Sequence, residues 1–206
     1  MKVVTVLNPS PVYTSIYVDE LAKRLDALLV CITDTRWPSW WCKMSAFDPD
    51  RFDGPMLFMD LDTVPVDGVQ PFLDYPLTES MMLRDFYNRD RPASGVMMIT
   101  ADDRAKVWRE WMKSPQAFRQ RHRILGDGAA IAEIIKPRLF LQDEFPGAIC
   151  SYKIDCQHGQ PEGVRLICYH GRPRPHETGW DTQSAARFIR RARVSFPPGR
   201  AFTLEQ

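Results

Sequence analysis

The chain has 206 residues, of which 44% are hydrophobic and 26% are charged, and its formal net charge is +1. This length and composition are typical of one compact domain, or of one domain with a small appendage. The near-neutral charge gives no overall electrostatic preference for nucleic acids or for acidic membrane surfaces. No apolar run is long enough to span a membrane, and the first one, residues 2–7, is too short for the core of a signal peptide.

The cysteines are odd in number and form no CxxC pair, so the sequence predicts neither a disulfide framework nor a zinc site. They are Cys31, Cys42, Cys150, Cys156 and Cys168. Because unpaired cysteines suit a reducing compartment, we expect a cytoplasmic protein.

In chain order, apolar runs alternate with stretches of helical spacing. We expect strands at residues 2–7, 29–33, 56–60, 81–85, 96–100, 149–154 and 164–169, and helices at residues 15–28, 37–47, 102–113 and 127–135. Asp102 or Asp103 is the expected N-cap of the third helix. This alternation predicts an α/β fold with a mixed, largely parallel central sheet flanked by helices. We place one domain at residues 1–180 and a basic C-terminal helix and tail at residues 181–206.

Two carboxylates one residue apart, Asp60 and Asp62, directly follow the apolar run at residues 55–59. If that run is a buried strand, both acids leave the core at its carboxyl end, where ligands usually bind in α/β sheets. Carboxylate oxygens are hard ligands suited to Mg²⁺ or Mn²⁺, and such a metal is commonly shared with the phosphates of a substrate. The alternative is structural, because two aspartates at a strand end can also make a turn and cap the next helix.

Five groups of residues extend this pattern over most of the chain. They are residues 13–18; residues 31–34 with the Trp-rich stretch 37–44; residues 57–66; residues 83–87 with 93–97; and Gly126-Asp127-Gly128 with residues 149–153 and 167–175. Together they resemble the nucleotide-sugar-dependent glycosyltransferases of the GT-A fold, Rossmann-like enzymes, and especially retaining enzymes like glycosyltransferase family 8 with its bacterial and phage relatives.

The resemblance implies a donor site with a divalent metal, Mn²⁺ or Mg²⁺. It implies that Asp62 coordinates the metal directly, that Asp60 shares the metal or binds the ribose, and that His170 is the third protein ligand. The remaining donor-binding residues are implied in the same way. Tyr13 would stack on the nucleotide base, Lys43 would lie near the phosphates or the sugar, Ser94 and Gly95 would lie under the sugar, and Arg174, with Gly171 in the same motif, would hold the diphosphate.

Two further acids are the catalytic candidates. The resemblance implies that Asp127 faces the donor sugar, and Asp85 is a candidate ligand of the sugar or of the metal site. Each has a structural alternative, since Asp127 can simply favour a helix N-terminus and Asp85 can pair with Arg84 on the surface. Among the aromatic residues, Trp40 and Trp41 are expected in the core rather than at an acceptor platform.

The sequence departs from the family pattern at three positions. Ala93 stands where many members have Asn, Gly128 replaces Gln, and Arg174 stands where Lys is usual. The loss of the amide at position 93 leaves the identity of the donor sugar open.

The implied function is metal-dependent transfer of a sugar from a nucleoside diphosphate sugar, a UDP-sugar by analogy, with retention at the anomeric carbon. The partners are the sugar nucleotide donor and an acceptor that the sequence does not identify, which could be a glycan, a protein, a small molecule or DNA.

Two alternatives belong to other classes of protein. Asp60 and Asp62 also resemble the nucleophile motif of haloacid-dehalogenase-like phosphohydrolases, although those enzymes usually begin with that strand. Two arginine-rich clusters can also track phosphate backbones, which allows a transferase that acts on a nucleic-acid base. These clusters are Arg119, Arg121, His122 and Arg123, and Arg187, Arg190, Arg191 and Arg193.

Overall fold

The computed structural model describes residues 1–183 of the chain. Its strands are β1 (Lys2–Leu7), β2 (Leu29–Thr33), β3 (Met56–Met59), β4 (Thr63–Pro65), β5 (Met81–Arg84), β6 (Pro92–Ile99), β7 (Leu139–Phe140), β8 (Ile149–Ser151) and β9 (Leu166–Cys168). Its α-helices are α1 (Ser15–Arg24), α2 (Gln70–Leu73), α3 (Ala101–Lys113), α4 (Pro115–Arg121), α5 (Gly126–Ile135), α6 (Leu141–Glu144) and α7 (Tyr152–Asp155). Three 3-10 helices complete it, η1 (Ser39–Phe47), η2 (Pro49–Arg51) and η3 (Pro175–Thr178).

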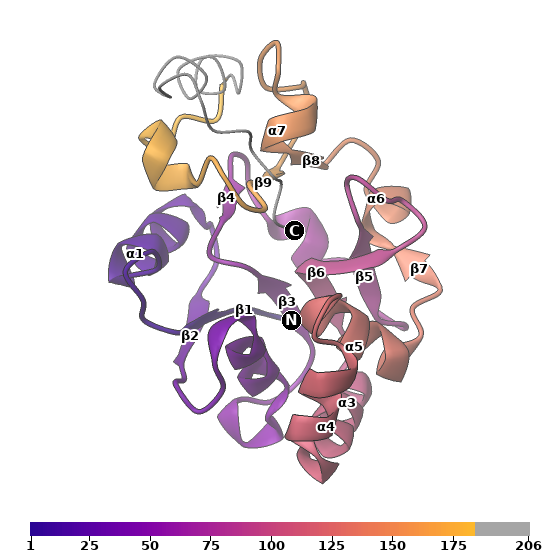
Figure 1. The fold of residues 1–206 in the computed structure, drawn as a ribbon. Helices are drawn as coiled ribbons and strands as arrows, with labels where there is room; N and C mark the ends of the chain where they lie inside the picture. The colour runs from indigo at the N-terminus through magenta and orange to yellow at the C-terminus, as the bar shows by residue number, and fades with distance from the viewer. Residues whose placement is uncertain (184–206) are drawn as a thin grey trace.

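The central sheet has six strands in the order β2-β1-β3-β6-β5-β7 (Figure 1). Strand β1 pairs parallel with β2 and β3, and β5 pairs parallel with β7, whereas β6 is antiparallel to both of its neighbours. All strands but β6 therefore run in one direction, which confirms the expected mixed, largely parallel sheet. A second sheet, in the order β4-β9-β8, lies at the top of Figure 1 with α7 and η3.

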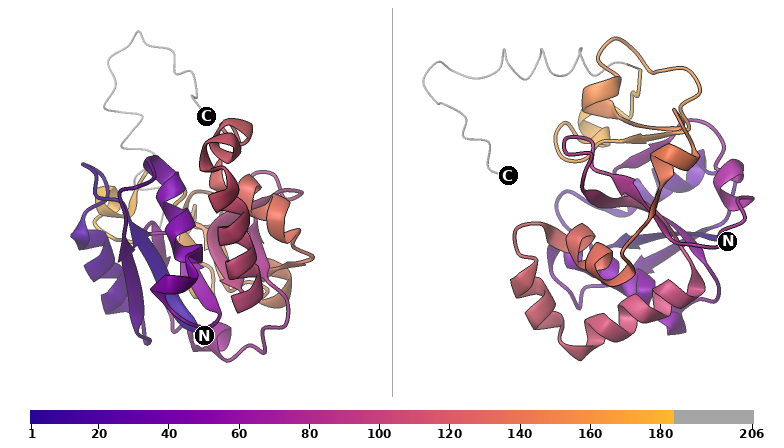
Figure 2. Two further views of the ribbon diagram at one scale, coloured as in Figure 1. Left: turned by 90° about the horizontal axis from the view of Figure 1, so that it is seen from below. Right: turned by 90° about the vertical axis from the view of Figure 1, so that its right-hand side faces the viewer.

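Side chains of the central strands alternate between two apolar layers, as the period of a β-strand requires. Met56 and Phe58 point to the layer that η1, α3 and α5 cover, whereas Leu57 and Met59 point to the layer that contains residues of α1, α2 and α6. Because both faces are covered, the strand reads as a continuous apolar run. Figure 2 shows helices on the two sides of this sheet.

Several predicted elements differ from the structure in their bounds; the strand expected at residues 96–100, for example, begins at Pro92, and the one expected at 164–169 covers only Leu166–Cys168. The first helix ends at Arg24 rather than residue 28, and the chain after it turns so that Asp26 accepts a hydrogen bond from the backbone N–H of Val69. The strand expected at residues 149–154 ends at Ser151, whose hydroxyl caps α7. Thr100, not Asp102 or Asp103, is the N-cap of α3, because its hydroxyl is the group that accepts the Asp103 N–H.

The Trp-rich stretch expected as a helix is the 3-10 helix η1, which begins at Ser39. Within residues 1–183, no helix has both the length and the apolar character that a membrane crossing needs. The predicted basic helix and tail at residues 181–206 lie, from residue 184 onward, outside the described residues.

Candidate active site

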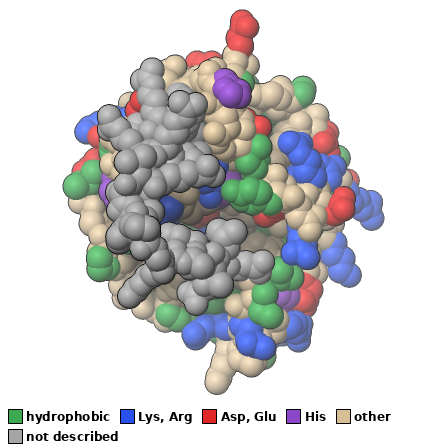
Figure 3. Space-filling view, turned by 45° about the horizontal axis from the view of Figure 1, so that its top comes forward, with side chains coloured by type: hydrophobic (Ala, Val, Ile, Leu, Met, Phe, Trp, Pro, Cys, Tyr) green, Lys and Arg blue, Asp and Glu red, His purple; other side chains and the backbone are tan. Residues whose placement is uncertain are grey.

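A cavity of about 790 Å³ lies where the central sheet meets the second sheet. Side chains that follow β1, β3 and β9 line it, and Figure 3 shows acidic and basic side chains within this hollow. All the predicted site residues except Gly171 line this cavity. They are Tyr13, Lys43, Asp60, Asp62, Asp85, Ser94, Gly95, Asp127, His170 and Arg174.

The acid pair occupies a tight turn between β3 and β4. The backbone N–H of Asp60 donates to the carbonyl of Gly95 at 2.8 Å, and that of Thr63 donates to the Asp60 carbonyl at 2.9 Å. Leu61 is buried, with 6% of its surface exposed, and anchors the turn between the two acids. Both acids therefore line the cavity at the carboxyl end of β3, as the sequence predicts.

A buried lysine connects two of the acids. The ammonium of Lys43, on η1, lies 2.9 Å from Asp60 Oδ2 and 2.8 Å from Asp127 Oδ2, and it donates to the Ser94 hydroxyl at 2.9 Å. That hydroxyl donates in turn to Asp127 at 2.7 Å. Burial favours the neutral amine, but the two carboxylates outweigh this effect and raise the pKa of Lys43. Burial raises the pKa of Asp60, and Lys43 opposes that rise.

Asp62 is held by a different pair of side chains. The hydroxyl of Tyr13 donates to Asp62 Oδ2 at 3.0 Å, and Arg174 donates to the same oxygen at 3.2 Å. The Arg174 guanidinium also lies 4.8 Å from the centre of the Tyr13 ring and contacts its hydroxyl. Burial raises the pKa of Tyr13, so it remains a phenol. In this arrangement Arg174 covers a face of the ring that is predicted to stack on the base.

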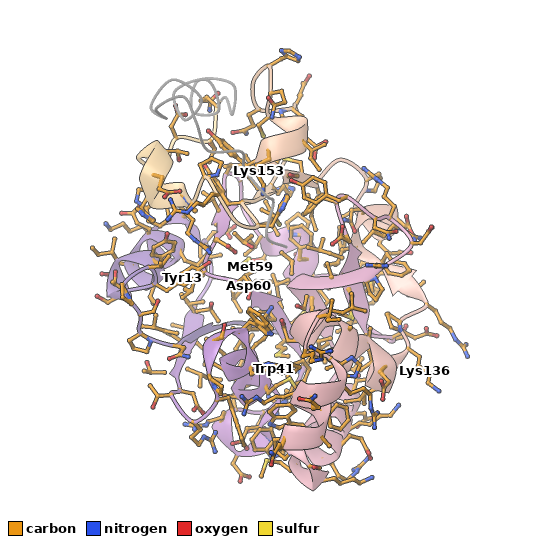
Figure 4. All side chains as sticks on the ribbon, viewed as in Figure 1. Tyr13, Trp41, Met59, Asp60, Lys136 and Lys153 are labelled. Atoms are coloured by element: carbon orange, nitrogen blue, oxygen red, sulfur yellow. The ribbon has the colours of Figure 1, made fainter. Side chains whose placement is uncertain are left out.

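His170 lines the cavity from the segment after β9. Its Nε2 is 2.6 Å from the Ser151 hydroxyl, its ring stacks on Phe86 at 5.2 Å, and Tyr87 meets it edge-on. Burial and the nearby ammonium of Lys153 lower the pKa of His170 to about 4, so the imidazole is neutral at pH 7. Figure 4 shows Tyr13, Asp60 and Lys153 around the junction of the two sheets.

The three predicted metal ligands, Asp60, Asp62 and His170, line one cavity but do not converge. No group of three His, Cys, Asp or Glu side chains within residues 1–183 is arranged to hold a metal ion. Asp60 is paired with Lys43 and Asp62 with Arg174. The donor set itself, two carboxylates and a neutral imidazole, fits Mn²⁺ or Mg²⁺. For Asp62 to bind a metal through Oδ2, it would exchange Arg174 for the ion.

Asp85 caps a turn rather than joining the acid cluster. Its Oδ1 accepts hydrogen bonds from the backbone N–H groups of Tyr87 and Asn88, both at 2.8 Å. The alternative of an ion pair with Arg84 is wrong, because Arg84 pairs with Asp143 at 2.6 Å. The other oxygen of Asp85 accepts no hydrogen bond from a described residue, and the residue lines the cavity.

The two predicted glycines of the site matter for close packing and for backbone conformation. Gly95 lies beneath Asp60, and a Cβ added there would be 3.8 Å from the carboxylate. Gly171 adopts a φ of +93°, and a Cβ added there would be 3.4 Å from the ammonium of Lys153. Because L side chains rarely adopt this φ, Gly171 shapes the segment that carries His170 and Arg174 rather than lining the cavity itself.

Apolar side chains form the rim on the α5 side. Trp40, Ile124 and Leu125 line the cavity with exposed fractions of 51%, 78% and 57%. The expectation that Trp40 lies in the core is wrong, whereas Trp41 is buried with 5% exposed. Sequence analysis therefore missed Trp40, Ile124 and Leu125 as rim residues, as it missed Ser151, Phe86 and Tyr87 around His170. Adjacent tryptophans carry no signal that separates a buried ring from an exposed one.

Comparison with solved structures finds glycosyltransferases. GlyE of Streptococcus pneumoniae TIGR4 matches with a TM-score of 0.58 and 14% identity, covering 95% of this chain and 60% of that one. The galactosyltransferase LgtC, solved with donor and acceptor sugar analogs, matches with a TM-score of 0.62 and 12% identity, covering 96% and 98%. A glycosyltransferase involved in glycosylation of the major capsid of PBCV-1 matches with a TM-score of 0.52 and 11% identity, covering 85% of this chain and 95% of that one.

The fold is that of these glycosyltransferases. The fold expected from the resemblance is thereby confirmed, while membership of family 8 stays a prediction. A scan of family models and a search of curated proteins each find no match to the sequence. The chain spans less than two thirds of GlyE.

Proposed function

We propose that this protein is a glycosyltransferase that moves a sugar from a nucleoside diphosphate sugar, with a UDP-sugar as the first candidate, to an acceptor. The observation that carries the proposal is the acid turn at the end of β3. It brings Asp60 and Asp62 into one cavity with Lys43, Asp127 and Arg174, in a chain whose fold matches that of glycosyltransferases.

The cavity offers a cation for the leaving group. Breaking the bond between the anomeric carbon and the diphosphate leaves negative charge on the phosphate oxygens, and fixed positive charge stabilises that development. Arg174 is the best-placed group, because 23% of its side chain is exposed and its guanidinium can grip a phosphate at two points. Lys43 has only 7% of its side chain exposed and is shared by two carboxylates. We assign it the role of holding Asp60 and Asp127 in place.

Asp60, Asp62 and His170 would hold the divalent ion, Mn²⁺ or Mg²⁺. When bound, such an ion supplies Lewis-acid stabilisation of the diphosphate. The Ser151 hydroxyl and the Phe86 ring fix the orientation of the imidazole, and burial keeps it in the neutral form that a ligand requires.

Asp127 is the acid that we place beneath the donor sugar. Its carboxylate is largely buried, with 11% of the side chain exposed, and Ser94 and Lys43 fix its orientation. A fixed carboxylate in that position favours the positive charge that develops at the anomeric carbon. Retention of configuration follows from the resemblance to retaining enzymes and is part of the proposal.

A thermal-shift screen of UDP, GDP and UDP-sugars, with and without Mn²⁺, tests donor binding, because a ligand that binds the native state raises its melting temperature. Release of nucleoside diphosphate from the sugar nucleotide then tests the chemistry. Asp62→Asn should abolish both effects, whereas Asp90→Asn, on an exposed turn outside the cavity, should leave them unchanged. Hydrolysis of p-nitrophenyl phosphate without any response to sugar nucleotides would favour the phosphohydrolase alternative instead.

A further inference from the structure

A second cavity, of about 620 Å³, lies between η1 and α4. Trp41 of η1, Trp37 just before η1 and Pro115 of α4 line it. The polar side chains in its wall lie on α4 and in the turn after it. Their positions three and four residues apart place them on one face of the helix. They are Gln116, Arg119, Gln120 and Arg123.

The polar groups in this wall have no partners in the part of the chain that the structure describes. None of the four polar side chains from α4 and its turn makes a hydrogen bond or an ion pair with a residue in 1–183. The Nε of Arg119 and the indole Nε1 of Trp37 are buried and unsatisfied as well. Buried polar groups are normally hydrogen-bonded, so these two buried nitrogens lack the partners they would ordinarily have. Gln116, Gln120 and Arg123 are exposed, so their donors are open to solvent and to a ligand that accepts hydrogen bonds.

The neighbouring arginine on the same helix, by contrast, has a carboxylate partner. Arg121 lies on the same helix but does not line the cavity, and it forms an ion pair with Glu133 at 2.6 Å. Among the described residues that line the cavity there is no acid. Two guanidinium groups without carboxylates beside them favour an anion.

Residues that line the second cavity are neighbours in the chain of residues that line the donor cavity, although no residue lines both. Ser39 and Trp40 of η1 face the donor cavity while Trp37 and Trp41 face the second one, and Ile124 and Leu125 directly follow Arg123. The exposed rim formed by Trp40, Ile124 and Leu125 therefore belongs to the same two segments of the chain as the second cavity. An acceptor that extends from the donor cavity over this rim would approach the arginines.

We propose that the second cavity binds an acidic sugar unit of the acceptor, with its carboxylate at Arg119 and Arg123 and its hydroxyl groups at the glutamine amides. This inference rests on the proposed function. A saccharide is favoured over a nucleic acid because the cavity offers amides for hydroxyl groups and only two free arginines for phosphates.

Calorimetric titration of the full chain with tetragalacturonate, maltotetraose and a single-stranded oligothymidylate, all at low salt, tests the proposal. We expect tetragalacturonate to bind and neutral maltotetraose to bind at least tenfold more weakly. The double variant Arg119→Gln, Arg123→Gln should weaken tetragalacturonate binding at least tenfold. The control Arg121→Gln, which removes one positive charge from α4 outside the cavity, should change it less than twofold.

Three results would overturn the proposal. They are an absence of tetragalacturonate binding, equal losses in the double variant and in Arg121→Gln, and preferential binding of the oligothymidylate through Arg119 and Arg123, which would identify a nucleic-acid acceptor. Circular dichroism melts establish that the variants are folded. UDP binding, measured separately on each variant, should be unchanged; if the wild-type protein binds tetragalacturonate but no nucleotide, the proposed function fails while this site stands.

Discussion

Replacing Lys43 with methionine should strongly destabilise the fold, because it leaves two carboxylates without their shared cation. The methionine fills the space of the lysine stem, so the cavity term is small. What remains is the electrostatic cost at Asp60 and Asp127. Removing one partner of a buried ion pair typically costs about 3–5 kcal/mol.

The exposed fractions set where in that range the loss should fall. The Asp127 side chain is 11% exposed and keeps the Ser94 hydrogen bond, whereas the Asp60 side chain is 33% exposed and can be partly hydrated. We therefore expect a loss of about 3 kcal/mol at pH 7, at the lower end of the range. Adding Asp127→Asn should recover about 1–2 kcal/mol of it, because one of the two unpaired charges is then gone.

Urea unfolding of wild type, both single variants and the double variant at pH 7 and pH 5 measures these values. Burial raises the pKa of Asp60 above that of the unfolded chain, and without Lys43 the nearby cation no longer opposes that rise. Such a group costs stability at high pH, and the cost disappears as it protonates, so the deficit should shrink at pH 5. Additive losses in the double variant, or a deficit that grows as the pH falls, would refute the charge-pairing argument.

Substitutions at three other positions test separate features. Gly126→Ala should cost about 1–2 kcal/mol in urea unfolding, because φ is +72° there and the new Cβ would lie 3.4 Å from the Trp40 indole nitrogen; an unchanged midpoint would contradict this. Burial alone would raise the pKa of Asp34, but hydrogen bonds from Arg36 and Ser45 lower it to about 2. Its contribution of about 2 kcal/mol should therefore be present above pH 4 and lost as the pH falls toward 2, a slope that Asp34→Asn should flatten in acid-unfolding curves. Tyr13→Phe should retain UDP affinity in calorimetry whereas Tyr13→Ala should lose tenfold or more, as expected of base stacking, and equal losses would point to the hydroxyl instead.

The location of the acids could be predicted from the sequence because β3 is buried on both faces. Because every residue of β3 is buried, acids that directly follow it must lie where the strand leaves the core, at its carboxyl end. The contacts of those acids could not be predicted in the same way. Arg174 and Tyr13 are 161 residues apart, and their contact depends on how the second sheet is placed against α1.

Local structure was hardest to predict where short-range hydrogen bonds compete with periodicity. The apolar spacing at residues 149–154 suits a strand, but the Ser151 hydroxyl caps a helical turn and ends the strand there. The roles of Trp40 and Trp41 depend on which side of a 3-10 helix faces α3, and composition does not specify that.

The turn that carries the acid pair also joins the two sheets. Asp60 is fixed to the central sheet through Gly95, whereas the Asp62 carbonyl accepts the backbone N–H of Tyr169, directly after β9 in the second sheet. A ligand that contacts both carboxylates therefore cross-links the two sheets. Its binding free energy stabilises the contact between the two sheets. Donor binding should therefore make them unfold more nearly as one cooperative unit.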